Sequence, residues 1–189
     1  IDYDYGNLSI TKLILYVSTK SESKVYDGLP LNSKNELEEC YYYPQNDAKN
    51  GRIDGLITGH SPKFKSITLT DAGNQSNDNL EDIIDGAGVS KAFNYEIRFS
   101  AGRLIVDKRE IYVTASSDAK VYDGKPLYSP DNDYTVTFYP DNDLTKTPII
   151  GENSVLVSGH TFRKKTPSVT DAGTVQNNPY ETVMQDATD

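Results

Sequence analysis

Lys24-Val25-Tyr26-Asp27-Gly28 recurs as Lys120-Val121-Tyr122-Asp123-Gly124, and this repeated stretch decides how the chain is organised. Around it, residues 1–31 align with residues 97–127 without a gap and share fourteen identities, where about two would arise from average residue usage. The chain of 189 residues therefore contains a tandem duplication. Each copy is long enough to bury a core of its own.

The second half of each copy also matches, after a change of length. Beyond Tyr43-Pro44 and Tyr139-Pro140 the second copy gains four residues, and the match resumes with Leu56/Leu156 and Gly59-His60/Gly159-His160. It continues with Thr-Asp-Ala-Gly at 70–73 and at 170–173. Because loops tolerate insertions, we expect the extra residues to form a surface loop.

The composition and the spacing of turn residues favour strands. Short runs rich in Val, Ile, Thr and Tyr are separated by Gly and Pro, and the chain has 14 Tyr and no Trp. Tyr95 to Phe99, Ser100-Ala101-Gly102 and Leu104 to Val106 predict a hairpin with Gly102 in its turn. Asn178-Pro179-Tyr180-Glu181 predicts one helical turn near residues 179–185.

These patterns predict an all-β protein made of two tandem immunoglobulin-like β-sandwich modules. The alternative is a pair of β-grasp-like modules with one short helix each. The first module would span residues 1–107 and the second residues 108–189, which lacks the final hairpin of the first. Residues 1–12 match the last strand of a preceding repeat. They would either pack on their own module as its first strand or fill the vacant edge of the second module in a neighbouring molecule.

Charge, cysteine content and hydropathy limit the partners. A net charge of -9 with scattered Lys and Arg argues against a nucleic-acid partner. One cysteine cannot form an internal disulfide. No apolar run approaches the eighteen or so residues that span a bilayer, so we expect no membrane insertion and expect any secretion signal or anchor to lie outside this segment.

Three sequence blocks resemble a known family. They are Lys-Val-Tyr-Asp-Gly-x-Pro-Leu at 24–31 and 120–127, Thr-Asp-Ala-Gly at 70–73 and 170–173, and Tyr-x-Ile followed by Gly-x-Leu-x-Val between Tyr95 and Val106. Together they are similar to the YDG and MBG repeats of large cell-surface, adhesin-like proteins, mostly of Gram-positive bacteria.

The resemblance implies a non-catalytic extracellular module that acts as a stalk, spacer or adhesive segment. It carries over no catalytic residue. The implied partners are adjacent repeat modules of the same protein and a host glycan or protein, and the implied location is the cell surface, with wall anchoring through other regions. The alternative function is a carbohydrate- or host-protein-binding module.

Candidate binding residues are aromatic. Tyr41 and Tyr43 alternate with Tyr42 on a predicted strand, and Tyr139 repeats the position of Tyr43 beside Pro140. Tyrosines on one face could form a contact patch for sugar or protein. Such rings are also ordinary cross-strand partners in a sheet.

Two acidic clusters carry the oxygen ligands that calcium prefers. They contain Asp131 and Asp133, and Asp141 and Asp143. A seven-residue strand between them spans roughly 20 Å, so they cannot share one ion. The alternative is that these residues make turns by bonding to their own backbone. We expect no cofactor other than calcium.

Lys12 and Lys108 share phase with the apolar residues of the strands before them. An inward lysine raises the hypothesis of a covalent bond to an Asn or Asp side chain. The alternative is that the strand bends and the ammonium reaches solvent along its alkyl stem.

His60, His160 and Cys40 are the remaining residues with reactive side chains. The two histidines occupy equivalent positions with no second His or Cys at metal-ligand spacing, which indicates a structural role. Cys40 aligns with Val136, which predicts a small buried apolar residue rather than a nucleophile.

Overall fold

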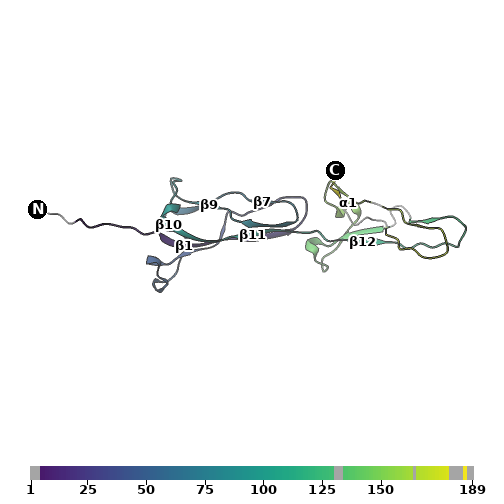
Figure 1. Ribbon diagram of the computed structural model, residues 1–189, viewed down its shortest axis with the longest axis horizontal. Coiled ribbons are helices and arrows are strands. Elements are labelled where there is room, and N and C mark those ends of the chain that lie inside the picture. The colour runs from purple at the N-terminus through teal and green to yellow at the C-terminus, as the bar shows by residue number, and fades with distance from the viewer. Residues whose placement is uncertain (1–4, 130–133, 164, 179–184, 187–189) are drawn as a thin grey trace. The chain divides into compact units, whose positions relative to one another are not determined.

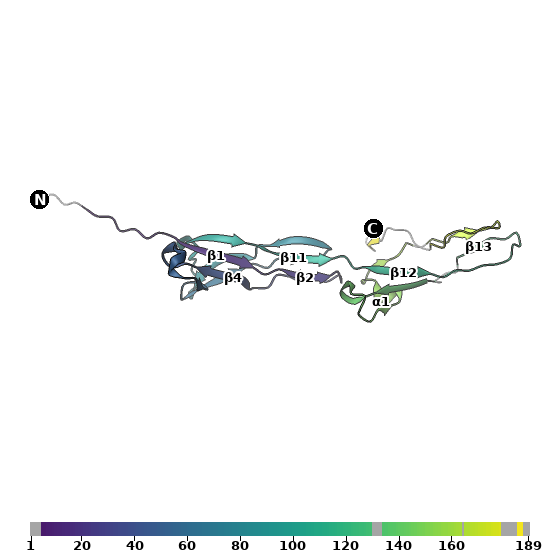
Figure 2. The same cartoon turned by 90° about the horizontal axis from the view of Figure 1, so that it is seen from below.

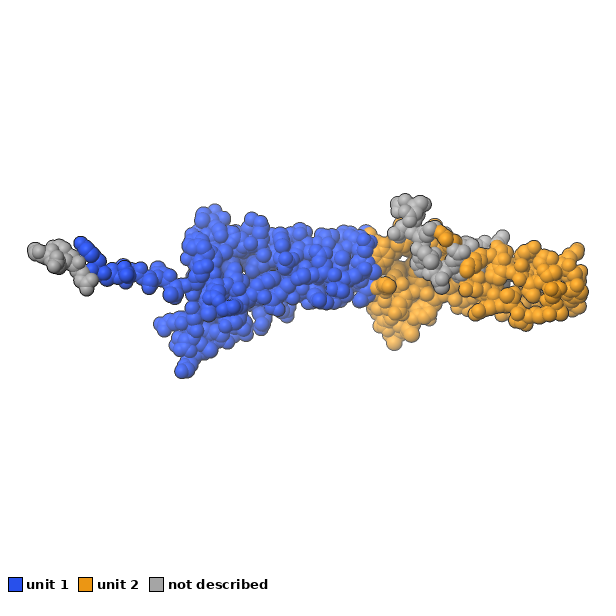
Figure 3. Space-filling view, viewed as in Figure 1, with its two compact units in different colours: residues 1–24, 29–107 blue, residues 25–28, 108–189 orange. Residues whose placement is uncertain are grey.

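The computed structural model describes residues 5–129, 134–163, 165–178 and 185–186. The chain forms two compact units (Figures 1 and 3). Unit 1 comprises Ile1–Lys24 and Leu29–Asp107, and unit 2 comprises Val25–Gly28 and Lys108–Asp189. Strands dominate both units, which confirms the all-β prediction.

Ten full strands and most of an eleventh, β2, lie in unit 1, together with three 3-10 turns. The strands are β1 (Leu13–Thr19), β2 (Glu22–Val25), β3 (Leu31–Asn32), β4 (Leu37–Tyr42), β5 (Ile53–Asp54), β6 (His60–Phe64), β7 (Thr68–Leu69), β8 (Gly73–Asn77), β9 (Leu80–Asp85), β10 (Tyr95–Ser100) and β11 (Gly102–Asp107). The 3-10 turns are η1 (Pro44–Asn46), η2 (Ala48–Asn50) and η3 (Ala92–Asn94). The described residues of unit 1 contain no α-helix, whereas a β-grasp module would require one.

Unit 2 is sparser in regular structure over the residues described. Its strands are β12 (Ile111–Ala115), β13 (Leu127–Tyr128), β14 (Tyr134–Phe138), β15 (Ile149–Ile150), β16 (His160–Thr161), β17 (Ser168–Val169) and β18 (Gln185–Asp186), with η4 (Pro140–Asn142) and α1 (Glu152–Val155). The sheets are β12-β14-β15, β13-β17 and β16-β18.

The sheets of unit 1 are β10-β1-β4-β5, β2-β11-β8, β3-β7 and β6-β9. β1 pairs with β10 in parallel, and β1 with β4 and β8 with β11 are antiparallel. The chain passes from β1 almost directly into β2 and from β10 directly into β11, so each segment contributes to two sheets (Figure 2).

Side-chain oxygens join these two segments where they change sheet. Thr19 Oγ1 accepts a hydrogen bond from Gly102 N at 3.0 Å, and Ser21 Oγ accepts one from Arg103 N at 3.0 Å. A Cβ on Gly102 would lie well inside van der Waals contact with the backbone oxygens of Thr19 and Lys20. The segments can approach this closely only because residue 102 has no side chain.

The predicted hairpin around Gly102 is therefore wrong. β10 and β11 lie in different sheets, and Ala101 joins them as one nearly continuous strand. The sequence pattern of a glycine between two alternating runs is the same for a tight turn and for a close backbone approach.

The core of unit 1 is built on alternating residues of β1. Leu15 and Val17 are buried together with Ile83 and Tyr95. Burial of every second residue is expected for a strand with one face on the core. Leu104 and Val106 of β11 are buried in the same alternating manner.

The four extra residues of the second copy form α1 rather than a surface loop. Gly55 N donates to Cys40 O and Gly151 N donates to Val136 O, so the copies still coincide at Gly151. The match resumes at Leu156, which leaves residues 152–155 as the insertion. Val155 is 0% exposed and packs with Val136 and Phe138. The loop prediction is wrong because the helical turn supplies a core side chain.

Residues 5–12 are exposed and form no strand. The prediction that residues 1–12 pack as the first strand of their own module is therefore wrong for the described part, and residues 1–4 lie outside it. Of the helical turn predicted near 179–185, residues 179–184 lie outside the described residues, and Gln185 belongs to β18. Among the residues described, no helix has the length and hydropathy needed to cross a membrane.

Candidate functional site: the repeated asparagine clamp

An asparagine side chain holds the backbone where the chain enters β1. Asn46 Oδ1 accepts a hydrogen bond from Ile14 N at 2.7 Å, and Asn46 Nδ2 donates to Lys12 O at 3.0 Å. The amide thus bonds to two alternate backbone groups as the peptide unit of a neighbouring strand would. We call this arrangement the asparagine clamp.

The backbone of η1 positions this side chain. Gln45 and Asn46 have φ of 55° and 57°, in the left-handed region that Asn tolerates better than other non-glycine residues. Asn46 N donates to Tyr43 O at 3.0 Å and Asp47 N to Pro44 O at 3.2 Å. Pro44 begins the turn with a φ that is already fixed.

Unit 2 contains the same clamp. Asn142 Oδ1 accepts from Glu110 N at 2.9 Å and its Nδ2 donates to Lys108 O at 2.8 Å. Asp141 and Asn142 both have φ of 55°. Since the two strained turns recur with the same partners, the arrangement belongs to the repeat and is not an accident of one copy.

Sequence reasoning missed the clamp although a signal was present. Pro44-Gln45-Asn46-Asp47 recurs as Pro140-Asp141-Asn142-Asp143 at the spacing of the duplication. An Asn that recurs at the same place in both turns indicates a residue with a left-handed backbone whose side-chain amide makes hydrogen bonds.

Tyrosines pack on the outer face of the strands beside the clamp. In unit 1, the rings of Tyr16 and Tyr41 stack with centroids 4.9 Å apart and an interplanar angle of 8°. Tyr43 meets both rings edge-on, at 6.0 Å from Tyr16 and 5.8 Å from Tyr41. In unit 2, Tyr112 and Tyr139 repeat the Tyr16–Tyr43 pair at 5.7 Å.

The predicted binding residues Tyr41 and Tyr43 are thus brought together, while Tyr139 makes the corresponding contact in unit 2. The guanidinium carbon of Arg52 lies 3.8 Å from the centroid of the Tyr41 ring. A guanidinium does not fit between two rings 4.9 Å apart, so Tyr16 and Arg52 cover opposite faces of Tyr41. Sugars stack on open ring faces, and Tyr41 offers none in this arrangement.

The acidic residues predicted as calcium ligands are engaged in turns where the structure describes them. Asp143 Oδ1 accepts from Thr145 N at 3.0 Å and from Thr145 Oγ1 at 2.7 Å, and these bonds lower the pKa of Asp143. Asp141 forms an ion pair with Lys146. Asp131 and Asp133 lie outside the described residues. No group of three or more candidate metal ligands is found in the part of the chain that the structure describes.

Lys12 and Lys108 are exposed, so their predicted inward orientation is wrong. The clamp bonds to the carbonyl oxygens of Lys12 and Lys108. The described residues before Lys12 are all exposed, and the alternating burial of β11 has ended before Lys108. The hypothesis of a cross-link to an Asn or Asp side chain required buried lysines, and both of these lysines are exposed.

The two histidines contact tyrosines. His60 Nδ1 lies 2.6 Å from Tyr95 Oη in unit 1. His160 Nε2 lies 3.4 Å from Tyr26 Oη, and the two rings stack with centroids 5.8 Å apart in unit 2. These contacts agree with a structural role for both histidines.

Cys40 is half-buried against the core of unit 1. Burial first, and then the nearby Asp54 carboxylate, raise the pKa of the Cys40 thiol. Because the thiolate is the reactive form, we expect alkylation of native protein by iodoacetamide at pH 8 to be at least tenfold slower than that of protein unfolded in urea. Mass spectrometry of timed samples measures both rates. Equal rates would contradict the burial of the Cys40 thiol in the folded protein.

Comparisons with protein-family models, with curated proteins and with solved structures find no match.

Proposed function

We propose that the chain is a non-catalytic spacer that carries tension in an extracellular protein of a bacterial surface. The observation that supports this function most directly is the parallel pairing of β1 with β10, which continues into β11. The chain enters the module at the start of β1 and leaves it at the end of β11. Tension along the chain therefore pulls the two segments past each other.

This geometry distributes load over many bonds. The register of β1 and β10 runs from Leu13↔Tyr95 to Ser18↔Ser100, and the Thr19 and Ser21 bonds extend it. Inter-strand bonds lie across the strand direction, so sliding two paired strands stretches them all together, whereas peeling breaks them one at a time. A spacer under tension therefore resists unfolding better when its paired strands must slide than when they can peel apart.

The asparagine clamp gives the point of entry a fixed geometry. It bonds to the main chain at Lys12 and Ile14 in unit 1 and at Lys108 and Glu110 in unit 2. We infer that it delivers tension to the first strand of each module along the strand axis, instead of letting that strand peel from its end.

The finer architecture belongs to the same proposal. Leu31↔Leu69 pairing between β3 and β7 recurs as Leu127↔Val169 between β13 and β17, which supports two tandem modules of one fold. We favour the immunoglobulin-like sandwich over the β-grasp. On the resemblance to YDG and MBG repeats, we propose adjacent modules as partners and the Gram-positive cell surface as the location.

A carbohydrate- or host-protein-binding role for the tyrosines is the competing proposal. The covered faces of Tyr41 favour the spacer over this role. A glycan array probed with the chain and with a Tyr43→Ala variant distinguishes them, since the spacer proposal expects no sugar-dependent signal that the substitution removes.

Single-molecule force spectroscopy on the chain, held by handles at both ends, tests the spacer. We expect unit 1 to give a force peak followed by an extension of roughly 30 nm, at about 3.5 Å for each released residue. Thr19→Val removes the acceptor of the Gly102 N–H, so it should lower this peak. Forced unfolding reports the unfolding rate.

Thr68→Val is the matched control, because Thr68 Oγ1 bonds to Asn32 in the separate β3-β7 pair. It should leave the peak force unchanged. A unit 1 that unfolds without a resolved peak, or an equal loss of force in both variants, would contradict the proposal.

A further inference from the structure

Two fully buried asparagines of unit 1 use only one end of their side-chain amide. Asn77 Nδ2 donates to Lys20 O at 2.7 Å, and Asn79 Nδ2 donates to Lys34 O at 2.7 Å. Both side chains are 0% exposed. Yet Oδ1 of each accepts no hydrogen bond from the residues that the structure describes. Buried polar atoms in folded proteins nearly always have a partner, so each of these oxygens calls for a donor.

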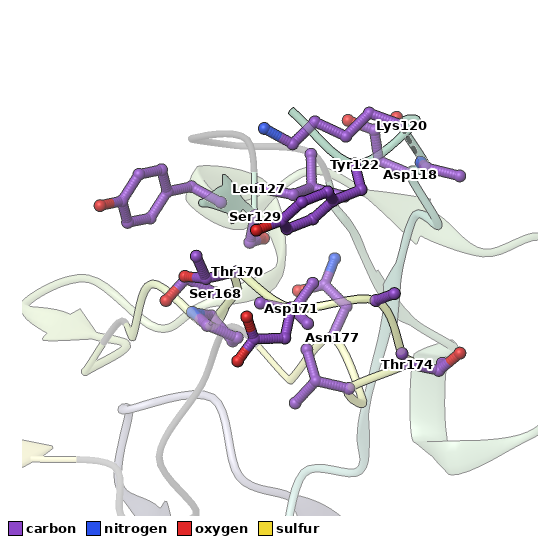
Figure 4. Close-up of a pocket in the computed structure, with 17 residues that line it drawn as sticks. Asp118, Lys120, Tyr122, Leu127, Ser129, Ser168, Thr170, Asp171, Thr174 and Asn177 are labelled. Carbon is purple, nitrogen blue, oxygen red and sulfur yellow. Dashed lines mark hydrogen bonds between the residues drawn. The ribbon is translucent and has the colours of Figure 1, made fainter. Parts of the chain in front are cut away.

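The same half-bonded amide recurs in unit 2. Asn177 is the repeat counterpart of Asn77, and its Nδ2 donates to Ser116 O, the counterpart of Lys20 O, at 2.8 Å. Its Oδ1 is also buried and receives no donor from the described part of the chain. Asn177 lies among the residues that line a hollow of about 330 Å³ in unit 2 (Figure 4). Because the arrangement is present in both copies, it belongs to the repeat.

The hydrogen bonds fix which end of each amide lacks a partner. A carbonyl oxygen can only accept, so the atom that faces Lys20 O, Lys34 O or Ser116 O has to be the NH₂ group. Turning any of these amides over would place two acceptors against each other. The unpartnered atom is therefore the oxygen in all three residues.

The two asparagines of unit 1 lie where the chain changes sheet. Residues 77 and 79 flank the passage from β8, in the β2-β11-β8 sheet, to β9, in the β6-β9 sheet. Lys20 lies between β1 and β2, and Lys34 between β3 and β4, which also belong to different sheets. The ladders of backbone hydrogen bonds are interrupted at such passages, so side chains and internal water have to satisfy the polar groups there.

The surroundings of Asn77 and Asn79 favour a neutral donor. Among the described residues, the buried polar side chains are those of Thr19, Asn77 and Asn79, and none of them is charged. A cation at this place would have no buried counter-charge. The Thr19 hydroxyl already donates to Asn77 O, so it is not the donor that the amide oxygens require.

We infer that Oδ1 of Asn77, of Asn79 and of Asn177 accepts a hydrogen bond from an internal water molecule, and that this water is a structural part of the repeat. Water is small, neutral and a donor of two hydrogen bonds, and buried waters typically bond to otherwise unsatisfied polar groups. The inference does not depend on whether the chain carries tension.

Water-selective NMR on the native ¹⁵N-labelled chain tests this binding directly. We expect nuclear Overhauser effects between water and the side-chain amide protons of Asn77, Asn79 and Asn177, with the sign of a long-lived complex. The rotating-frame experiment separates these effects from proton exchange. The exposed Asn74 of β8 is the matched control and should show only transient hydration. Transient hydration alone at Asn77 and Asn177, or a scalar coupling that reveals a protein donor to Oδ1, would overturn the inference.

Relaxation dispersion of water ¹⁷O provides a second readout with variants. The native chain should show a dispersion from long-lived internal water. Asn77→Leu should lose part of its amplitude, because leucine offers no acceptor, whereas Asn74→Leu on the exposed part of β8 should keep it all. Circular dichroism checks that both variants are folded, and the native NMR spectra decide the matter if Asn77→Leu is not. A native chain without dispersion, or equal amplitudes in the two variants, would refute the internal water.

Discussion

Unit 1 is expected to lose about 3 kcal/mol or more of its free energy of unfolding when Gly102 is replaced by valine. A side chain at this position meets the backbone oxygens of Thr19 and Lys20. Those atoms belong to the paired segment and cannot rotate away as the end of a side chain could. The two segments must separate, which breaks the Thr19 and Ser21 bonds to Gly102 N and Arg103 N.

Urea unfolding followed by far-UV circular dichroism and by hydrogen exchange of β1 peptides measures this loss. Gly6→Val is the matched control, because the same substitution at the repeat counterpart meets open space. It should leave the stability of both units within about 0.5 kcal/mol of native. A Gly102→Val protein as stable as Gly6→Val would refute the close approach of the two segments.

Asn142→Ala is expected to destabilise unit 2 by about 3–4 kcal/mol. The substitution leaves Glu110 N and Lys108 O without the partner that Asn142 provides, at about 1 kcal/mol for each bond. Alanine at a φ of 55° adds about 1–2 kcal/mol of backbone strain. Asn142→Gly removes the same bonds without the strain, so its loss should be smaller by that amount.

Hydrogen exchange locates the effect. Amides of Glu110–Ala115 should exchange faster in Asn142→Ala, while those of Leu13–Thr19, held by the equivalent Asn46, should exchange at the native rate. If Asn142→Ala and Asn142→Gly are equally stable, the left-handed turn carries no strain. If neither differs from native, the clamp does not hold β12.

Several features of this fold follow from local sequence. The Lys-Val-Tyr-Asp-Gly repeat predicts two equivalent copies, and pairings such as Leu31↔Leu69 and Leu127↔Val169 recur accordingly. The β-rich composition predicts strands, and β1 buries alternate residues as a half-buried strand does. Two copies of one sequence adopt the same local structure where their surroundings are the same, so the sequence repeat by itself predicts the structural repeat.

Other features depend on which segments meet in space. A glycine between two alternating runs predicted a turn at 100–102, but β10 and β11 continue in one direction because β1 and β2 run beside them. The four inserted residues predicted a loop, but Val155 becomes part of a core. Asp141-Asn142-Asp143 predicted a metal site, but Asn142 bonds to a strand that begins more than thirty residues earlier.

The sequence alone determined that this protein is all-β, that it is duplicated, and that residues 6–11 have the pattern of a strand that closes a module. Only the tertiary structure decided that its counterpart β11 is a central strand, between β2 and β8 in unit 1. The physical reason is that alternation and turn residues act over a few neighbours along the chain. The neighbours of a strand in a sheet, by contrast, are set by backbone bonds between segments that can be eighty residues apart, as Gly102 and Thr19 are.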